Sequence, residues 1–205
     1  TLLGAHLERR PVAVAFFGLA LLTSVYGTVN ASRTRVKHIT VKLPGLPESW
    51  RGRTAALVTD WHLGHVRNRG FVRHILKMLT RLRPDVLFIT GDLFDGSAVD
   101  LDRLCEPWTK FSVPLGSYFV TGNHEEFSSP TKYLEAVKQC GICILNNEKV
   151  VVDGLQIVGV HYHDSVNDEK LRPVLAQAAL NRDVASILLV HTPNLLPVAE
   201  ETGFS

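Results

Sequence analysis

Four short groups of polar residues in this 205-residue chain combine carboxylate, amide and imidazole side chains. The groups are Asp60-Trp61-His62, Gly91-Asp92, Gly122-Asn123-His124-Glu125 and His191. Asp, Asn and His together offer oxygen and nitrogen ligands, a set suited to Zn, Mn or Fe rather than to Ca. In an extended D-x-H segment both side chains point to the same side, a geometry that allows Asp60 and His62 to hold one ion. The pattern therefore predicts a metal centre.

Each polar group directly follows an apolar run that predicts a β-strand. The runs span 54–60, 86–90, 117–121 and 185–190, and the first two are continuous enough to be expected in the middle of a sheet. Open α/β sheets bind ligands at the carboxyl ends of their strands, so the four groups are expected to meet. Taken one at a time, each group is explained as a helix cap, a turn or a core histidine. Four of them in order at strand ends favour one shared site.

The rest of the chain after residue 34 alternates helices with strands, which predicts a layered α/β domain. Apolar residues at helical spacing predict a helix over 71–82, and further helices are expected at 101–111, 130–140 and 168–180. Asp153-Gly154 predicts a hairpin turn between strands at 149–152 and 155–158. Polar and apolar residues alternate over 35–43, which predicts a strand with one exposed face.

The N-terminal segment has no charged residue from Pro11 to Ser32. The apolar run over 12–29 would span about 27 Å as a helix, close to the hydrocarbon thickness of a bilayer. A signal peptide normally has a shorter apolar core and a small-residue cleavage site, and a soluble core helix normally has a polar face. We therefore expect a transmembrane helix at about 11–30, a membrane anchor over 1–33 and a catalytic domain over 34–205. The basic residues after the helix slightly outnumber those before it, which favours a cytoplasmic domain but leaves the orientation open.

Composition and cysteine content narrow the functional classes further. A net charge of +2, with no Lys/Arg run interleaved with aromatics, gives no expectation of nucleic-acid binding. Cys140 and Cys143 form a C-G-I-C pair, but a structural zinc site needs a second pair, which the three cysteines do not supply. We expect Cys140 to end a helix and Cys143 to begin a buried strand. The cysteines do not fix the cellular compartment.

Together the polar blocks resemble the calcineurin-like metallophosphoesterase superfamily, whose pattern is D-x-H, G-D, G-N-H-[DE], a lone H and then G-H-x-H. The first four blocks stand here as T-D-W-H-L-G, T-G-D-L-F-D-G, T-G-N-H-E and V-H-T-P, and the resemblance runs from about Arg35 to the end. It is greatest to the bacterial membrane-associated branch, which includes phosphodiesterases and a UDP-diacylglucosamine pyrophosphate hydrolase. The resemblance implies a four-layer α/β/β/α sandwich of two mixed sheets between helices.

The resemblance also implies roles for the site residues. Two divalent ions (Mn, Zn or Fe) would be bound, the first by Asp60 and His62 and the second by Asn123 and His191, with Asp92 bridging them. His124 would lie beside the scissile phosphate as a proton donor or as a stabiliser of negative charge. A metal-activated hydroxide would attack a phosphomonoester or phosphodiester, and a membrane location favours a lipid-linked substrate. His161 and His163, in G-V-H-Y-H-D, match no ligand of the pattern and are expected to play a supporting or surface role.

The sequence departs from the family pattern because it contains no G-H-x-H block. That block would supply one histidine to each ion, so we expect a C-terminally truncated chain that binds metal weakly and turns over poorly by itself. The alternative is a membrane-tethered, non-catalytic remnant or binding protein. In either case the expected location is a membrane, most simply a bacterial cell membrane, with the side of the catalytic domain undetermined.

Overall fold

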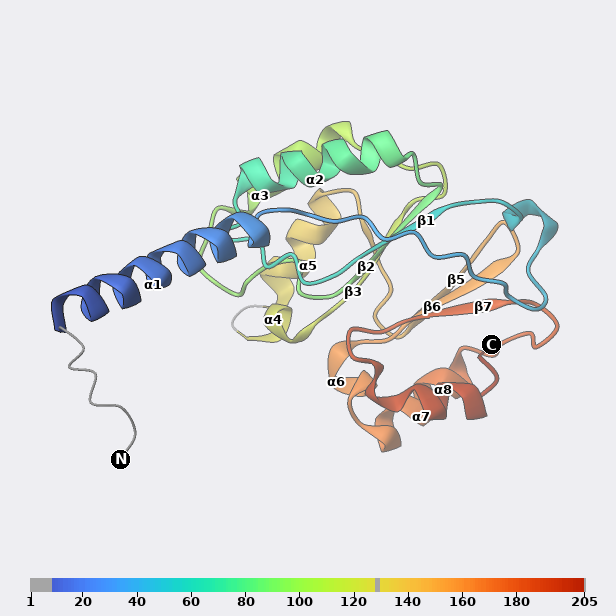
Figure 1. Cartoon of the computed structure of the whole chain (residues 1–205). Helices are drawn as coiled ribbons and strands as arrows, with labels where there is room; N and C mark the ends of the chain where they lie inside the picture. Colours follow the sequence, from blue (N-terminus) through green and yellow to red (C-terminus); the bar gives the residue numbers. More distant parts are fainter. Residues whose placement is uncertain (1–8, 128–129, 205) are drawn as a thin grey trace, which may run out of the picture. The chain divides into compact units, whose positions relative to one another are not determined.

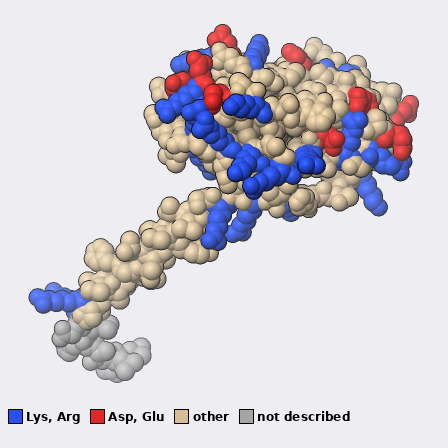
Figure 2. Space-filling model, turned by 90° about the horizontal axis from the view of Figure 1, so that it is seen from above, with Lys and Arg blue, Asp and Glu red and all other residues tan. Residues whose placement is uncertain are grey.

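The computed structural model describes residues 9–127 and 130–204, and the chain divides into two units, Thr1–Lys42 and Leu43–Ser205. Over its described residues, 9–42, the first unit contains one helix, α1 (Arg9–Ala31), of 23 residues, none of which is buried. Figure 2 shows this helix as a rod of uncharged side chains between basic residues near its two ends. At about 1.5 Å per residue it is long enough to cross a membrane, and its composition is apolar enough to do so.

The strand predicted at 35–43 is wrong. The structure has no strand between residues 33 and 43, and the apolar Val36, Ile39 and Val41 are exposed by 44%, 70% and 66%. A strand requires a neighbour for its backbone hydrogen bonds, and this segment pairs with none of the described strands. Alternation of polar and apolar residues is therefore not sufficient here.

The second unit contains two sheets that lie face to face (Figure 1). In the first sheet all neighbouring strands are parallel, in the order β1 (Ala55–Val58), β2 (Val86–Thr90), β3 (Ser117–Val120) and β4 (Cys143–Ile144). The second sheet is mixed, in the order β5 (Glu148–Val152), β6 (Leu155–Gly159) and β7 (Ser186–Leu189). The predicted hairpin joins β5 to β6, where Asp153 and Gly154 have φ values of 45° and 89°, as a tight two-residue turn requires.

Helices cover the outer face of each sheet, so the unit has four layers, α/β/β/α, as the resemblance implied (Figure 1). The helices are α2 (Arg69–Leu82), α3 (Leu101–Cys105) and α5 (Pro130–Gln139) on the first sheet, and α7 (Asp168–Gln177) and α8 (Leu196–Glu201) on the second. Strand β2 shows why the layers stack. Its alternate residues Leu87 and Ile89 pack under the helices, whereas Val86 and Phe88 pack between the sheets.

Strand β1 differs from expectation because it lies at the edge of its sheet and not in the middle. Leu57 is 67% exposed, and the described strands give β1 a partner, β2, on one side. The predicted helix over 101–111 also divides, into α3 and a 3₁₀ helix, η2 (Glu106–Lys110). Pro107 has no backbone N–H to continue the α-helical pattern.

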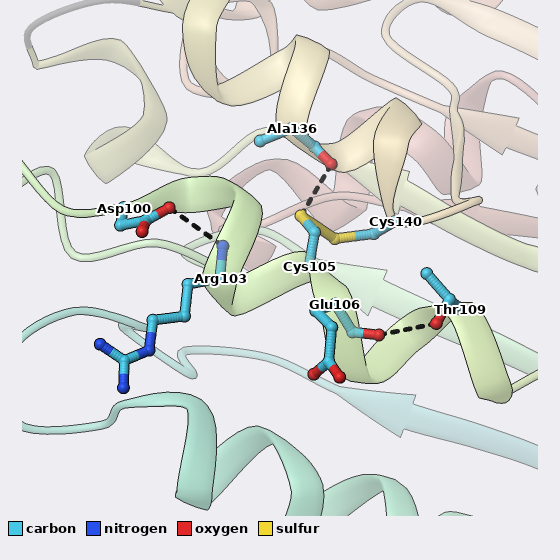
Figure 3. The surroundings of a disulfide bond; sticks show 7 residues. All are labelled: Asp100, Arg103, Cys105, Glu106, Thr109, Ala136 and Cys140. Carbon is cyan, nitrogen blue, oxygen red and sulfur yellow. Dashed lines mark hydrogen bonds between the residues drawn. A yellow bond between two sulfur atoms is a disulfide. The ribbon is translucent and has the colours of Figure 1, made fainter.

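A disulfide links Cys105, the last residue of α3, to Cys140, directly after α5 (Figure 3). The sequence did not indicate this pairing. Cys143 begins β4 as expected, but it is exposed rather than buried. The Cys105 sulfur lies 3.0 Å from the carbonyl oxygen of Ala136, and it can donate a hydrogen bond there only when reduced, because a disulfide sulfur carries no proton. The disulfide thus fixes α3 against α5.

Candidate metal centre

The loops that follow β1, β2, β3 and β7 bring all six predicted site residues together. The residues are Asp60 and His62 after β1, Asp92 after β2, Asn123 and His124 in the short helix α4 (Asn123–Glu126) after β3, and His191 after β7. Strands β1, β2 and β3 are parallel and adjacent, so their carboxyl ends lie at one edge of the sheet. The loop after β7 reaches the same edge from the second sheet.

Asp92 lies at the centre of this arrangement. Its residue is 3% exposed. Its Oδ2 atom is 3.5 Å from Nε2 of His191, 3.7 Å from Nε2 of His62 and 3.9 Å from Nε2 of His124. A buried carboxylate is costly unless positive charge faces it, and three imidazole nitrogens with one carboxylate oxygen form a cation-binding set.

The ligand atoms form two groups that share Asp92. One group is Asp60, Asp92 and His191, the other is His62, Asp92 and His124, and within each group the ligand atoms lie within 4.8 Å of one another. The resemblance had paired Asp60 with His62, whose carboxylate and Nε2 are 3.6 Å apart, and Asn123 with His191, at 3.2 Å. Both divisions fit these distances, because all the side chains surround one small space. The residues present therefore fit the binding of divalent metal.

The second nitrogen of two histidines is fixed by a backbone carbonyl. Nδ1 of His191 lies 2.8 Å from the Thr90 oxygen, and Nδ1 of His124 lies 2.9 Å from the Asp95 oxygen. A carbonyl can only accept, so Nδ1 carries the proton in each ring and Nε2 keeps its lone pair. Histidine ligands of metals are commonly oriented in this way.

The backbone of the first two loops is not extended. Asp60, His62 and Asp92 have φ values of 55°, 45° and 53°, so the argument from an extended D-x-H segment is wrong. Left-handed backbone at non-glycine residues is unfavourable and persists where the surroundings impose it. Here backbone hydrogen bonds join the two loops. The His62 N–H donates to the backbone carbonyl oxygen of Asp92 at 2.9 Å, and the Asp60 N–H donates to that of Gly91 at 3.2 Å.

Two glycines allow the loops to approach this closely. A Cβ atom on Gly91, whose φ is 84°, would lie 2.6 Å from Nδ1 of His191. A Cβ atom on Gly122 would overlap Oδ1 of Asp92. Any side chain at either position would displace a candidate ligand.

Glu125 binds the backbone of the loops after β2 and β3, which carry candidate ligands. This role was not identified from the sequence. Glu125 is completely buried, and its carboxylate accepts from the backbone N–H groups of Gly122 at 2.8 Å, Asp92 at 3.0 Å and Phe94 at 3.1 Å. Burial raises the pKa of Glu125, and the three N–H donors oppose that rise. The signal available in the sequence was the acidic position that ends the G-N-H-[DE] block.

Replacement of Glu125 by glutamine is expected to weaken metal binding, although no candidate ligand is changed. The amide NH₂ would face a backbone N–H, so at least one buried donor would lose its acceptor, at a cost of about 1–3 kcal/mol in unfolding free energy. Metal affinity should fall by roughly 10–100-fold, as for other residues that orient ligands. Urea unfolding and metal titration measure the two effects. Glu135→Gln, on the exposed face of α5, is the matched control, and unchanged metal affinity in Glu125→Gln would contradict the supporting role.

His161 and His163 lie beside this centre and belong to neither ligand group. They are at the start of α6 (Tyr162–Ser165), not in an extended stretch. Their Nε2 atoms lie 3.0 Å and 3.6 Å from the two carboxylate oxygens of Glu126. Glu126 is on α4 with Asn123 and His124, so the pair borders the helix that carries them.

Comparison with known proteins identifies the family. The description "Calcineurin-like phosphoesterase" matches residues 54–203. A "Transmembrane protein with metallophosphoesterase domain" from Danio rerio is 35% identical over 145 residues, covering 70% of this chain and 33% of that protein. An "Uncharacterized metallophosphoesterase" from Aquifex aeolicus is 30% identical over 147 residues, covering 71% and 56%.

A third relative is named for its substrate. The "UDP-2,3-diacylglucosamine pyrophosphatase" of Chlamydia trachomatis is 28% identical over 92 residues, covering 44% of this chain and 28% of that protein. The chain thus spans between 28% and 56% of the length of these relatives. The family match extends over most of the sequence and includes every predicted site residue. The chain therefore belongs to the calcineurin-like phosphoesterase family.

Proposed function

We propose that this chain carries the catalytic domain of a membrane-anchored phosphoester hydrolase that uses two divalent metal ions. The family makes hydrolysis of phosphoric esters the general activity. The observation that supports two ions is the position of Asp92, a buried carboxylate whose Oδ2 atom lies 3.7 Å from Nε2 of His62 and 3.5 Å from Nε2 of His191.

The chain's own residues have distinct tasks in this proposal. Asp60, His62, Asp92, Asn123 and His191 hold the cations. When bound, Mn, Zn or Fe ions polarise the phosphoryl oxygens and lower the pKa of water. His124 is held by the Asp95 oxygen with Nε2 facing the site. In its doubly protonated form, with Nδ1–H still donating to the Asp95 carbonyl oxygen, the His124 ring would donate from Nε2 to a phosphate oxygen or to the leaving alkoxide.

A membrane location would restrict the substrate. Helix α1 meets the length and composition needed for a membrane span, and two vertebrate relatives are named as transmembrane proteins. The Chlamydia relative is named for a diacylated sugar nucleotide. We therefore place the protein in a membrane, with a bacterial cell membrane as the simplest case, and assign it a phosphoester or pyrophosphate of a lipid-linked compound.

The test is hydrolysis of p-nitrophenyl phosphate and bis-p-nitrophenyl phosphate by the detergent-solubilised protein that contains this chain. Removal of metal with a chelator should abolish turnover, and Mn or Zn should restore it. Turnover that persists without metal would contradict the proposal.

The two groups of candidate ligand atoms would also suit a second function, metal binding without catalysis. A membrane-tethered binding protein would retain the ligands described above and bind metal without hydrolysis. Metal binding with no turnover of either aryl ester would support this second function over the first.

A further inference from the structure

A cleft of about 510 Å³ opens beside the metal centre, between the start of α2 and α3. Its walls include Gly64 and His65 from the first metal loop, Arg69 and Arg73 from α2, and Arg103 from α3. These residues belong to neither group of candidate metal ligands. The cleft is far larger than the space that a water molecule needs.

The walls of the cleft carry more guanidinium groups than the neighbouring carboxylates neutralise. Glu106 lies 2.7 Å from Arg69 and 3.6 Å from Arg73, so one carboxylate serves two arginines. The Arg103 guanidinium has no ion pair among the described residues. Asp100 also lines the cleft and accepts the Arg103 backbone N–H at 3.1 Å as the cap of α3, so the three arginines face two carboxylates.

Figure 3 shows the Arg103 side chain extending from α3 toward the ribbon of α2, away from the disulfide. A guanidinium that faces an open cleft without a carboxylate partner is suited to an anion.

The cleft and the metal centre share two loops. Gly64 is two residues beyond His62, and its Cα lies directly against the side chain of Asp95. The backbone oxygen of Asp95 in turn lies 2.9 Å from Nδ1 of His124, and the rings of His62 and His124 are 4.4 Å apart. A substrate bound near these two histidines would therefore have the cleft next to it.

We propose that this cleft binds a second phosphate group of the substrate, with Arg103 as the principal contact. The inference rests on the proposed hydrolase function and adds a specificity determinant to it. Arginine binds phosphate through paired, charge-assisted hydrogen bonds. The first turn of the 14-residue α2 adds the positive end of its dipole to the same cleft.

Binding of phosphonates to the metal-loaded, full-length protein without excess metal tests the proposal. Methylphosphonate carries one anionic group, and alkane bisphosphonates with linkers of one, three and five carbons carry two at different separations. By calorimetry the best linker should bind roughly 10–100-fold more tightly than methylphosphonate, the gain expected from one charged hydrogen-bonding contact. In Arg103→Ala that gain should disappear, while binding of methylphosphonate stays within about twofold of the unsubstituted protein.

The matched control is Arg81→Ala, an exposed arginine in the last turn of α2 that does not line the cleft. It should keep the full gain. Both variants should keep their thermal unfolding temperature, and Arg81→Ala should also keep its turnover of p-nitrophenyl phosphate. The proposal is overturned if no linker improves on methylphosphonate or if the gain survives in Arg103→Ala. In that case, metal-dependent turnover of p-nitrophenyl phosphate would still support the hydrolase function. Conversely, if the gain depends on Arg103 but p-nitrophenyl phosphate is not hydrolysed, the hydrolase function is refuted and the anion-binding site stands.

Discussion

Asp92→Asn is expected to lose metal binding and hydrolysis together. The amide removes the negative charge that faces three imidazole nitrogens and turns one oxygen into an NH₂ donor. Both ligand groups depend on this carboxylate, so neither cation keeps its full set. Loss of several kcal/mol of charge stabilisation should lower kcat/KM by about 10³-fold or more. Metal analysis after dialysis and hydrolysis of p-nitrophenyl phosphate measure the two effects.

Two further substitutions separate this effect from a general loss of stability. Asp60→Asn changes one ligand group and should reduce bound metal by less than Asp92→Asn does. Asp102→Asn makes the same chemical change on the exposed face of α3 and should leave both measurements unchanged. Wild-type metal content in Asp92→Asn would show that the carboxylate does not join the two groups.

The features predicted correctly from the sequence are those determined by neighbouring residues. Apolar spacing placed α2, the Asp153-Gly154 turn placed the β5–β6 hairpin, and a continuous apolar run placed β2. The order of polar blocks at strand ends also predicted which residues meet, because parallel strands end at the same edge of a sheet.

The features that were missed depend on contacts distant in sequence. The segment at 35–43 has the pattern of a strand but lacks a partner, and β1 has the composition of a central strand but lies at an edge. The left-handed backbone of Asp60 and His62 is imposed by hydrogen bonds to the loop after β2, about thirty residues away, which no D-x-H pattern reveals.

The hydrogen bonds that orient the candidate ligands could not be predicted from the sequence for the same reason. Glu125 binds three backbone N–H groups from two loops, and the Nδ1 partners of His124 and His191 are carbonyl oxygens. Carbonyl oxygens and N–H groups occur at almost every residue, so the sequence does not mark the ones that are used. The sequence thus predicted which polar side chains lie together, but not the backbone groups that orient them.

The disulfide is a further long-range contact, and its removal is expected to have the second large effect. The paired cysteines are 35 residues apart, and closing a loop of that length is expected to stabilise the folded state by about 4 kcal/mol through the lost entropy of the unfolded chain. The double variant Cys105→Ala/Cys140→Ala should therefore lose about that much free energy of unfolding, measured by guanidinium denaturation. The exposed, unpaired Cys143 provides the control, because Cys143→Ser should unfold like the unsubstituted protein.

Reduction of the unsubstituted protein should be less damaging than the double alanine variant. The freed Cys105 thiol can donate to the Ala136 oxygen 3.0 Å away, which should recover up to about 1 kcal/mol. Equal stability with and without reductant would show that the disulfide contributes nothing. Arg103 lies two residues before Cys105 on α3, so a loosened α3 should also weaken bisphosphonate binding in the double variant while methylphosphonate binding, which does not involve α3, is kept. A loss of bisphosphonate binding alone would show that the disulfide positions Arg103 by holding α3 in place.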